Sequence, residues 1–208
     1  MRPDYSIYPQ YDFAVAMTSR GCPRGCAFCH VGKKEGLKSV KVADVDKFYT
    51  GQKTIAVLDP NILACRDRLD LLSQYADTGA KINYNQGLDI RLMSDDVLEI
   101  LNRTKLYDVH FAWDNPKDDL APKFKEYART ARNKPHGRFG TVFVLANYQS
   151  TIEEDLHRIY TLRDLGFDPY VMLYDKPNAD QRHRDLQRWV NNIRLFRTIK
   201  TFAEYERR

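Results

Sequence analysis

The sequence predicts an α/β fold in which a mostly parallel sheet is covered by helices, arranged as an incomplete, TIM-like (β/α)6 barrel. Three observations lead to this fold class. Short apolar runs of strand length alternate along the chain with segments of helical period. The runs are almost continuously apolar, as in parallel strands that are buried on both faces. Six such units are present, whereas a closed barrel has eight, so we expect a barrel that is open at one side.

The strand candidates are rich in β-branched and aromatic residues. They lie at residues 13–17, 54–58, 81–84, 109–113, 141–145 and 170–173. Helical patterns lie between them, near residues 42–49, 67–75, 95–102, 120–132 and 152–165.

The alternation of strands and helices ends near residue 175. Beyond it, five apolar side chains predict the buried stripe of one further helix: Leu186, Trp189, Val190, Ile193 and Phe196. We therefore predict a barrel domain over residues 1–175 and a C-terminal helical extension, residues 176–208, that packs on the barrel.

Composition narrows the class of protein. The 208 residues suggest one domain with an appendage, and the longest apolar runs are too short to span a membrane. The N-terminus has no hydrophobic signal region, so we expect a cytoplasmic protein. Of four cysteines, three are clustered, which favours metal binding over disulfides. Residues 176–208 hold nine Lys or Arg and four Asp or Glu, so they carry the whole net charge of +5.

Three cysteines follow the first predicted strand with the spacing C-x3-C-x2-C. They are Cys22, Cys26 and Cys29, within residues 21–30, which we call the cysteine loop. Thiolates this close in sequence converge only if the backbone curls around a metal, and Gly21 and Gly25 permit that curl. Three ligands bind three irons of a [4Fe–4S] cube, whereas sets of four cysteines usually close a cluster for electron transfer. An open metal position is typical of chemistry, as it is at catalytic zinc sites.

This motif resembles the cluster motif of the radical SAM superfamily, including the aromatic Phe28 just before the last cysteine. In that superfamily, the amino and carboxylate groups of S-adenosylmethionine (SAM) chelate the open iron. One electron then cleaves the sulfonium and releases a 5′-deoxyadenosyl radical. The resemblance implies a [4Fe–4S] cluster, SAM, a partial barrel and a place for Phe28 at the cofactor site. Sites in parallel barrels collect after the strand C-termini, which is where the cysteine loop lies.

The alternative for the motif is a zinc site of three cysteines completed by His30 or Cys65. His30 is a poor fourth ligand, because neighbours in sequence rarely reach one metal with tetrahedral geometry. A lone cysteine such as Cys65 is more often a small buried residue than a ligand. Residues 31–36 are flexible and basic, which favours a solvated connection.

Asp59 and Asn61 follow the second predicted strand. Radical SAM enzymes often have a Gly-Gly-Glu-type segment here, whose groups receive the amino group of SAM, and this sequence lacks it. Asp59 and Asn61 supply acceptors at the matching position and are our candidates for that role. The alternative is that Asn61 makes a turn and caps the segment after it.

Polar residues and glycine crowd the end of the third predicted strand, from Asn85 to Arg91. A guanidinium can clamp a carboxylate through two hydrogen bonds, so we predict that Arg91 holds the methionine carboxylate of SAM. Asn85, at the same strand end, is a second cofactor candidate. The alternative is that Asp89 and Arg91 form a local ion pair.

The last three strands each end in one candidate for the nucleoside part of SAM. Asp114 is suited to the ribose hydroxyls, although an Asx turn also explains it. Asn147 lies at the mouth of the fifth strand. Residues 150–154 read as a capping box, so the acidic residues there are not predicted to be catalytic. Tyr174 closes the sixth strand, where adenine packs in the radical SAM superfamily.

The sequence thus predicts a radical SAM enzyme that acts on an unidentified substrate. Such an enzyme needs an electron donor such as flavodoxin or ferredoxin. The basic, aromatic-rich C-terminal segment favours a macromolecular substrate, either a peptide or an RNA, and no membrane partner is expected. Two alternatives stay open from the sequence. One is a binding module stabilised by zinc or an inert cluster, and the other is a truncated, inactive radical SAM remnant.

Overall fold

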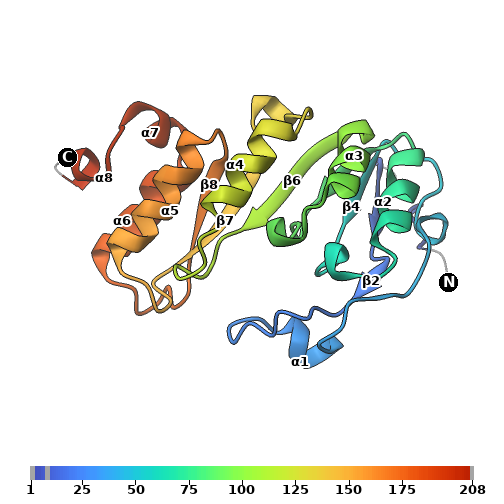
Figure 1. Ribbon diagram of the computed structural model, residues 1–208, viewed down its shortest axis with the longest axis horizontal. Helices are drawn as coiled ribbons and strands as arrows, with labels where there is room; N and C mark the ends of the chain where they lie inside the picture. The colour runs from blue at the N-terminus through green and yellow to red at the C-terminus, as the bar shows by residue number, and fades with distance from the viewer. Residues whose placement is uncertain (1–2, 8–9, 207–208) are drawn as a thin grey trace. The chain divides into compact units, whose positions relative to one another are not determined.

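The computed structural model, which describes residues 3–7 and 10–206, divides into two compact units (Figure 1). The first comprises the described residues up to Phe111 together with Arg129–Gly140. The second comprises Ala112–Ala128 and the described residues from Thr141 onward. All six predicted strands are present, they pair in parallel within each unit, and helices alternate with them. The α/β fold class is therefore confirmed.

Four parallel strands form the sheet of the first unit, in the order β1 (Phe13–Ala16), β4 (Thr54–Val57), β5 (Lys81–Tyr84) and β6 (Leu106–Ala112). The register aligns the ends of β1, β4 and β5, since Val57 pairs with both Ala16 and Tyr84. Because parallel strands end at one edge, the loops after β1, β4 and β5 emerge side by side. This register brings the predicted site loops of the first unit together.

Helices α2 (Arg68–Asp77) and α3 (Asp95–Arg103) pack against each other in the first unit. Along the strands of this sheet, fully buried side chains alternate with partly or fully exposed ones, although the apolar runs predicted burial on both faces. Tyr84 of β5 meets Tyr75 of α2 edge to face, with ring centroids 6.2 Å apart. Burial raises the pKa of both hydroxyls far above the usual range, and the nearby Asp59 adds to that shift.

Three short elements differ from the sequence-based expectation. The predicted helix at residues 42–49 is only the 3-10 turn η1 (Val45–Lys47), and of its apolar side chains Val45 is buried while Val42 is 51% exposed. Residues 31–36, expected as a flexible connection, contain helix α1 (Val31–Glu35). A two-stranded antiparallel pair, β2 (Ser19–Arg20) and β3 (Val40–Lys41), flanks the cysteine loop and α1.

The second unit has two parallel strands and the helices around them. They are β7 (Thr141–Ala146), β8 (Asp168–Leu173), α4 (Ala121–Thr130) and α5 (Ile152–Asp164). The backbone just after β6 joins β7, since the Trp113 amide donates to the Phe143 carbonyl at 2.8 Å. Phe124 of α4 stacks on Trp113 and meets Phe167 edge to face, and these three rings are buried.

The chain after residue 175 forms α6 (Gln181–Asn191), α7 (Ile193–Thr198) and α8 (Phe202–Glu206). Helix α6 packs on β8, where Asn191 accepts from the Val171 amide and donates to the Val171 carbonyl. The predicted C-terminal helices are therefore present, but the apolar stripe expected on one helix is divided between two. Asn192 interrupts it, and Ile193, placed on the buried stripe by the sequence, is 42% exposed. Among the residues described, no helix combines the length and apolar character needed to cross a bilayer.

Candidate functional site

The cysteine loop begins at the end of β2 and leads into α1, at one end of the first unit (Figure 1). Its base is closed by contacts with the end of α1. The Glu35 carboxylate accepts from the Gly21 amide and from the Arg20 guanidinium, each at 3.1 Å. The Cys22 amide donates to the Gly36 carbonyl at 3.2 Å. Gly21 has φ +83°, and a Cβ there would collide with the Lys38 carbonyl oxygen, so only glycine fits.

The three motif cysteines are partly exposed thiols, and none forms a disulfide. A turn links two of them, because the Cys29 amide donates to the Cys26 carbonyl at 2.9 Å. Within residues 3–7 and 10–206, no three His, Cys, Asp or Glu side chains are gathered as a metal-binding group. The donor set itself is of the type that iron–sulfur clusters use, three thiols on one loop that ligands can reach. Cys65, in contrast, is completely buried at the end of η2 (Ile62–Ala64).

Asp59 is buried just after β4, and its carboxylate accepts hydrogen bonds from the segment that leads into the cysteine loop. One carboxylate oxygen accepts from the Thr18 amide at 3.0 Å. The other accepts from the Thr18 hydroxyl at 2.8 Å, the Ser19 hydroxyl at 2.7 Å and the Ser19 amide. The hydroxyl of Tyr75 lies 3.4 Å from the same carboxylate. Both oxygens are thus engaged inside the protein, which is a role that the sequence did not predict.

Asn61 caps η2, as the local interpretation of this residue predicted. Its Oδ1 accepts from the Ala64 amide at 3.3 Å. Its Nδ2 is directed toward the cysteine loop, 3.5 Å from the Cys22 sulfur, and lies 3.4 Å from Asp89 Oδ2. The capping geometry therefore also holds a polar side chain beside the first motif cysteine.

Asp89, at the end of the β5 loop, joins two guanidiniums. Arg91 Nε donates to its Oδ1 at 2.7 Å, so the predicted local ion pair is present. Arg24, from inside the cysteine loop, donates through Nε to Oδ2 at 2.6 Å. The Asp89 side chain is only 5% exposed. Burial alone would raise the pKa of this carboxyl, but hydrogen bonds from Arg91 and Arg24 outweigh it and leave the pKa lowered.

Two further candidate residues, Phe28 and Asn85, also belong to the first unit. Phe28 is half-buried in the cysteine loop. Asn85 is exposed at the end of β5, where its amide donates to the Val57 carbonyl at 3.2 Å. Asn85 therefore stands at the same edge of the sheet as the loop that carries Asn61.

The candidates of the second unit occupy the ends of successive strands. Asp114 accepts from the Leu145 amide at 3.2 Å. Asn147 adopts a positive φ of 60° just after β7, and its amide donates to Asp155 Oδ2 at 3.2 Å. Tyr174, just after β8, is 53% exposed, and its ring centroid lies 4.5 Å from that of Tyr148.

A buried ion pair supports these strand ends. Arg158 donates to Asp155 and to the backbone carbonyls of Trp113 and Leu145, and both charged side chains are almost fully buried. The start of α5 is the predicted capping box, formed by Thr151 and its partner three residues on. The sequence did not identify Arg158 as structural. Its signal in the sequence is an arginine three residues after an aspartate, on a helix face whose other buried members are apolar.

The structure thus gathers part of the predicted site in the first unit. Asn61, Cys22, Asp89 and Arg91 lie within one connected set of contacts. Arg24 belongs to the same set, although the sequence analysis did not single it out. Its signal was its position in the middle of the C-x3-C spacer.

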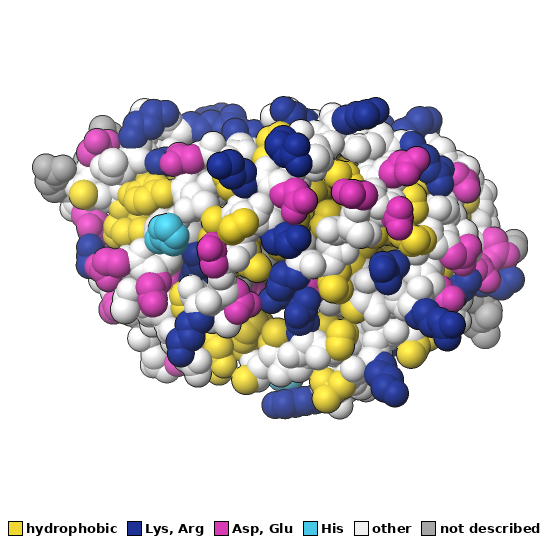
Figure 2. All heavy atoms as spheres, in the orientation of Figure 1, with side chains coloured by type: hydrophobic (Ala, Val, Ile, Leu, Met, Phe, Trp, Pro, Cys, Tyr) yellow, Lys and Arg dark blue, Asp and Glu magenta, His cyan; other side chains and the backbone are white. Residues whose placement is uncertain are grey.

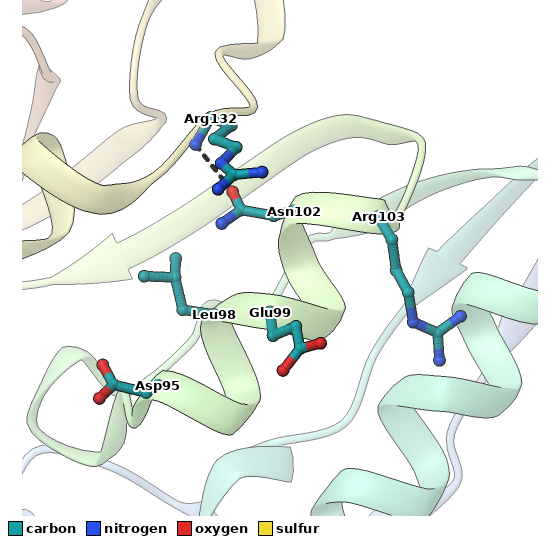
Figure 3. Close-up of a pocket in the computed structure, with 6 residues that line it drawn as sticks. All are labelled: Asp95, Leu98, Glu99, Asn102, Arg103 and Arg132. Atoms are coloured by element: carbon teal, nitrogen blue, oxygen red, sulfur yellow. Dashed lines mark hydrogen bonds between the residues drawn. The ribbon is translucent and has the colours of Figure 1, made fainter.

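Figure 3 shows a pocket of about 470 Å³ in a different part of the first unit. It is lined by side chains of α3 and by Arg132, whose amide donates to Asn102 Oδ1 at 2.7 Å. None of the predicted cofactor residues lines this pocket.

Comparison with known proteins gives a structural likeness only. No family of known sequences and no curated protein matches the chain. The structure of Streptococcus suis SuiB bound to precursor peptide SuiA matches with a TM-score of 0.61 and 14% identity, over 89% of this chain and 46% of that one. SuiB bound to S-adenosylmethionine matches with a TM-score of 0.58 and 15% identity, over 89% and 45%. This chain therefore spans a little under half the length of these structures, and its fold is similar to that of Streptococcus suis SuiB.

Proposed function

We propose that this chain is a radical SAM enzyme that holds a [4Fe–4S] cluster through Cys22, Cys26 and Cys29 and cleaves SAM reductively. The observation that supports this most is the place of the C-x3-C-x2-C loop. It follows the first strand of a parallel α/β fold that is similar to a protein bound to SAM. When bound, such a cluster supplies the electron that cleaves the sulfonium bond.

Asp89 pairs with the guanidiniums of Arg24 and Arg91, and it lies next to the Asn61 side chain that is directed toward Cys22. We assign Arg91 to the methionine carboxylate of SAM. Asn61, Asn85 and Phe28 complete the proposed first-unit part of the site, with Asn61 orienting polar groups next to the cysteine loop. Both oxygens of Asp59 accept hydrogen bonds from Thr18 and Ser19, so the proposed role of Asp59 is to fix the segment that leads into the cysteine loop.

The proposed contacts to the nucleoside of SAM come from the second unit. Asp114 and Asn147 present polar groups at strand ends for the ribose hydroxyls. The exposed ring of Tyr174, with Tyr148 beside it, offers an aromatic surface for adenine.

The proposed substrate is a peptide. The support is the likeness to SuiB, which was solved with a precursor peptide. The C-terminal aromatics that would serve RNA stacking are engaged in the core instead, since Trp189, Phe196 and Phe202 are at most 3% exposed. Flavodoxin or ferredoxin remains the proposed class of electron donor.

The test is anaerobic reconstitution with iron and sulfide, followed by SAM and dithionite, with 5′-deoxyadenosine as the product measured. We expect a brown protein that forms 5′-deoxyadenosine even without substrate. Cys22→Ala, Cys26→Ala and Cys29→Ala should each lose the iron–sulfur absorption, whereas Cys65→Ala should retain it because Cys65 is buried elsewhere. A colourless zinc protein would overturn the proposal. Loss of the cluster in Cys65→Ala would indicate a four-cysteine site without an open iron.

A further inference from the structure

We infer that Asp89 is a positioning residue that fixes the cysteine loop through Arg24, so that the three thiols are preorganised for their metal. This inference rests on the proposed function, because it concerns assembly of the same site. It names two residues, Asp89 and Arg24, to which the superfamily motif assigns no role.

The contact of Arg24 with Asp89 fixes the loop at a point between two of the motif cysteines. Arg24 is the middle residue of the three that separate Cys22 from Cys26. Proline on one side limits the backbone, and Gly25 on the other turns it with a φ of +57°. A fixed side chain in the middle of this spacer therefore sets the separation of the first two thiols.

The geometry at Asp89 is that of a shared clamp. Its two oxygens accept from different guanidiniums, Oδ2 from Arg24 at 2.6 Å and Oδ1 from Arg91 at 2.7 Å. Asp89 also accepts from the Arg91 amide at 3.2 Å, which fixes the carboxylate on its own backbone turn. A carboxylate held at both oxygens and by its own backbone turn has a fixed position, so it anchors the Arg24 side chain of the cysteine loop.

A second contact links Asp89 to the first thiol. Asn61 Nδ2 lies 3.4 Å from Asp89 Oδ2 and 3.5 Å from the Cys22 sulfur. The loops after β4 and β5 thus meet the cysteine loop at two adjacent points. In metal sites, such partners of the ligands orient them, and removing them costs about 10–100-fold in metal affinity.

An ordinary surface ion pair is the competing interpretation, and burial decides between the two. Exposed pairs contribute little because water and salt screen them. Here the Asp89 side chain is 5% exposed and the Arg24 side chain is 33% exposed. The chain offers a matched control in the same unit. Asp77 and Arg103 form a pair of equal length, 2.6 Å, with exposures of 67% and 47%.

The first measurement uses the metal-free, full-length protein. Iodoacetamide alkylation of each cysteine is followed by peptide mass spectrometry under native conditions, with buried Cys65 as the internal reference for folding. Asp89→Asn and Arg24→Ala should each raise the alkylation rates of Cys22 and Cys26 several-fold and leave that of Cys65 unchanged. Asp77→Asn should change none of these rates. Arg24→Lys keeps the charge and should restore part of the protection.

The second measurement is iron retained after anaerobic reconstitution and gel filtration. We expect Asp89→Asn and Arg24→Ala to retain about tenfold less iron than the wild type, and Asp77→Asn to match the wild type. The Arg24→Ala variant keeps the test valid if Asp89→Asn fails to fold. Unchanged alkylation rates in a folded Arg24→Ala would overturn the inference. A wild-type protein that binds no iron would overturn the proposed function, while the alkylation result would still decide the inference.

Discussion

Asp59 and Asp89 both contact the cysteine loop or the segment before it, but they bind chemically different partners. Asp59 bonds to the neutral groups of Thr18 and Ser19, so it fixes the backbone just before the loop. Asp89 bonds to guanidiniums and so fixes a charged side chain within the loop. We therefore expect the contacts of Asp59 to contribute to folding stability and those of Asp89 to set the geometry of the proposed site.

Replacing Asp59 with Asn should destabilise the first unit. The new amide nitrogen cannot accept hydrogen bonds, so donors of Thr18 or Ser19 lose their buried partner. The expected loss in free energy of unfolding is about 1–3 kcal/mol, which is the cost of a buried unsatisfied group. Urea unfolding of the metal-free protein measures it. An unchanged midpoint would show that water replaces the carboxylate without cost.

Replacing Arg91 with Ala should weaken SAM binding to the reconstituted protein. The methionine carboxylate would lose a charge-assisted hydrogen bond, which is worth about 1.5–3 kcal/mol. That corresponds to an increase in Kd of roughly 10–150-fold at 25 °C. Equilibrium dialysis with labelled SAM measures the affinity, and Arg103→Ala is the matched surface control. An unchanged affinity would show that Arg91 does not bind the carboxylate of SAM.

Among the elements, the break between α6 and α7 shows how one side chain overrides a longer pattern. The spacing of apolar residues continues across Asn192, but its side chain accepts from the amides of Arg194 and Leu195, each at 3.2 Å. Asparagine is a strong helix N-cap and a weak helix-interior residue. The new helix turns Ile193 outward while Trp189 and Phe196 stay packed edge to face.

Replacing Asn192 with Ala should cost about 0.5–2 kcal/mol in stability, because the start of α7 loses its cap. The expected result is a lower urea midpoint of the second unit. Asn178→Ala is the control, since Asn178 is exposed and its side chain bonds only to Asp175 among the contacts described. Equal midpoints for the two variants would mean that packing of α7, and not its cap, holds the break in place.

Across the whole molecule, the positive charge is concentrated in the C-terminal segment, where two arginines make local contacts. Arg182 pairs with Glu206 at 2.8 Å, and Arg184 donates to the carbonyls of Ala179 and Pro177, both at 2.9 Å. On the face that Figure 2 shows, Lys and Arg side chains are interspersed with Asp and Glu and do not form one continuous patch. A solvated helix face explains the charges.

RNA binding should therefore be weak and non-specific. We expect a Kd no tighter than about 10⁻⁶ M for a mixed-sequence RNA at physiological salt. The measurement is fluorescence anisotropy across a salt series, for the wild type and for a variant with Arg188, Arg194 and Arg197 changed to Gln. Removal of the segment is unsuitable as a control, because Trp189 belongs to the core. Tight binding whose salt slope falls in the variant would make the segment an RNA site.

Features that depend on near neighbours could be predicted from the amino-acid sequence alone. Strand positions follow from apolar runs, and the capping box at Thr151 follows from residues three apart, so both reflect local chemistry. The cysteine motif is also local, and the chemistry predicted from its spacing and its resemblance to the radical SAM motif stays a prediction. The helix predicted at 42–49 was wrong for the opposite reason, since whether an apolar face is covered depends on which distant segments pack there.

The contacts around the cysteine loop, in contrast, depend on how distant segments pack in three dimensions. Asp59 and Ser19 are 40 residues apart in sequence, and Arg24 and Asp89 are 65 apart. Each pair meets because β1, β4 and β5 run parallel in register and so deliver their loops to one edge. A polar residue at a strand end looks the same in sequence whether it serves a ligand or a neighbouring loop. The register of the strands, which is set by packing across the sheet, decides which of the two it meets.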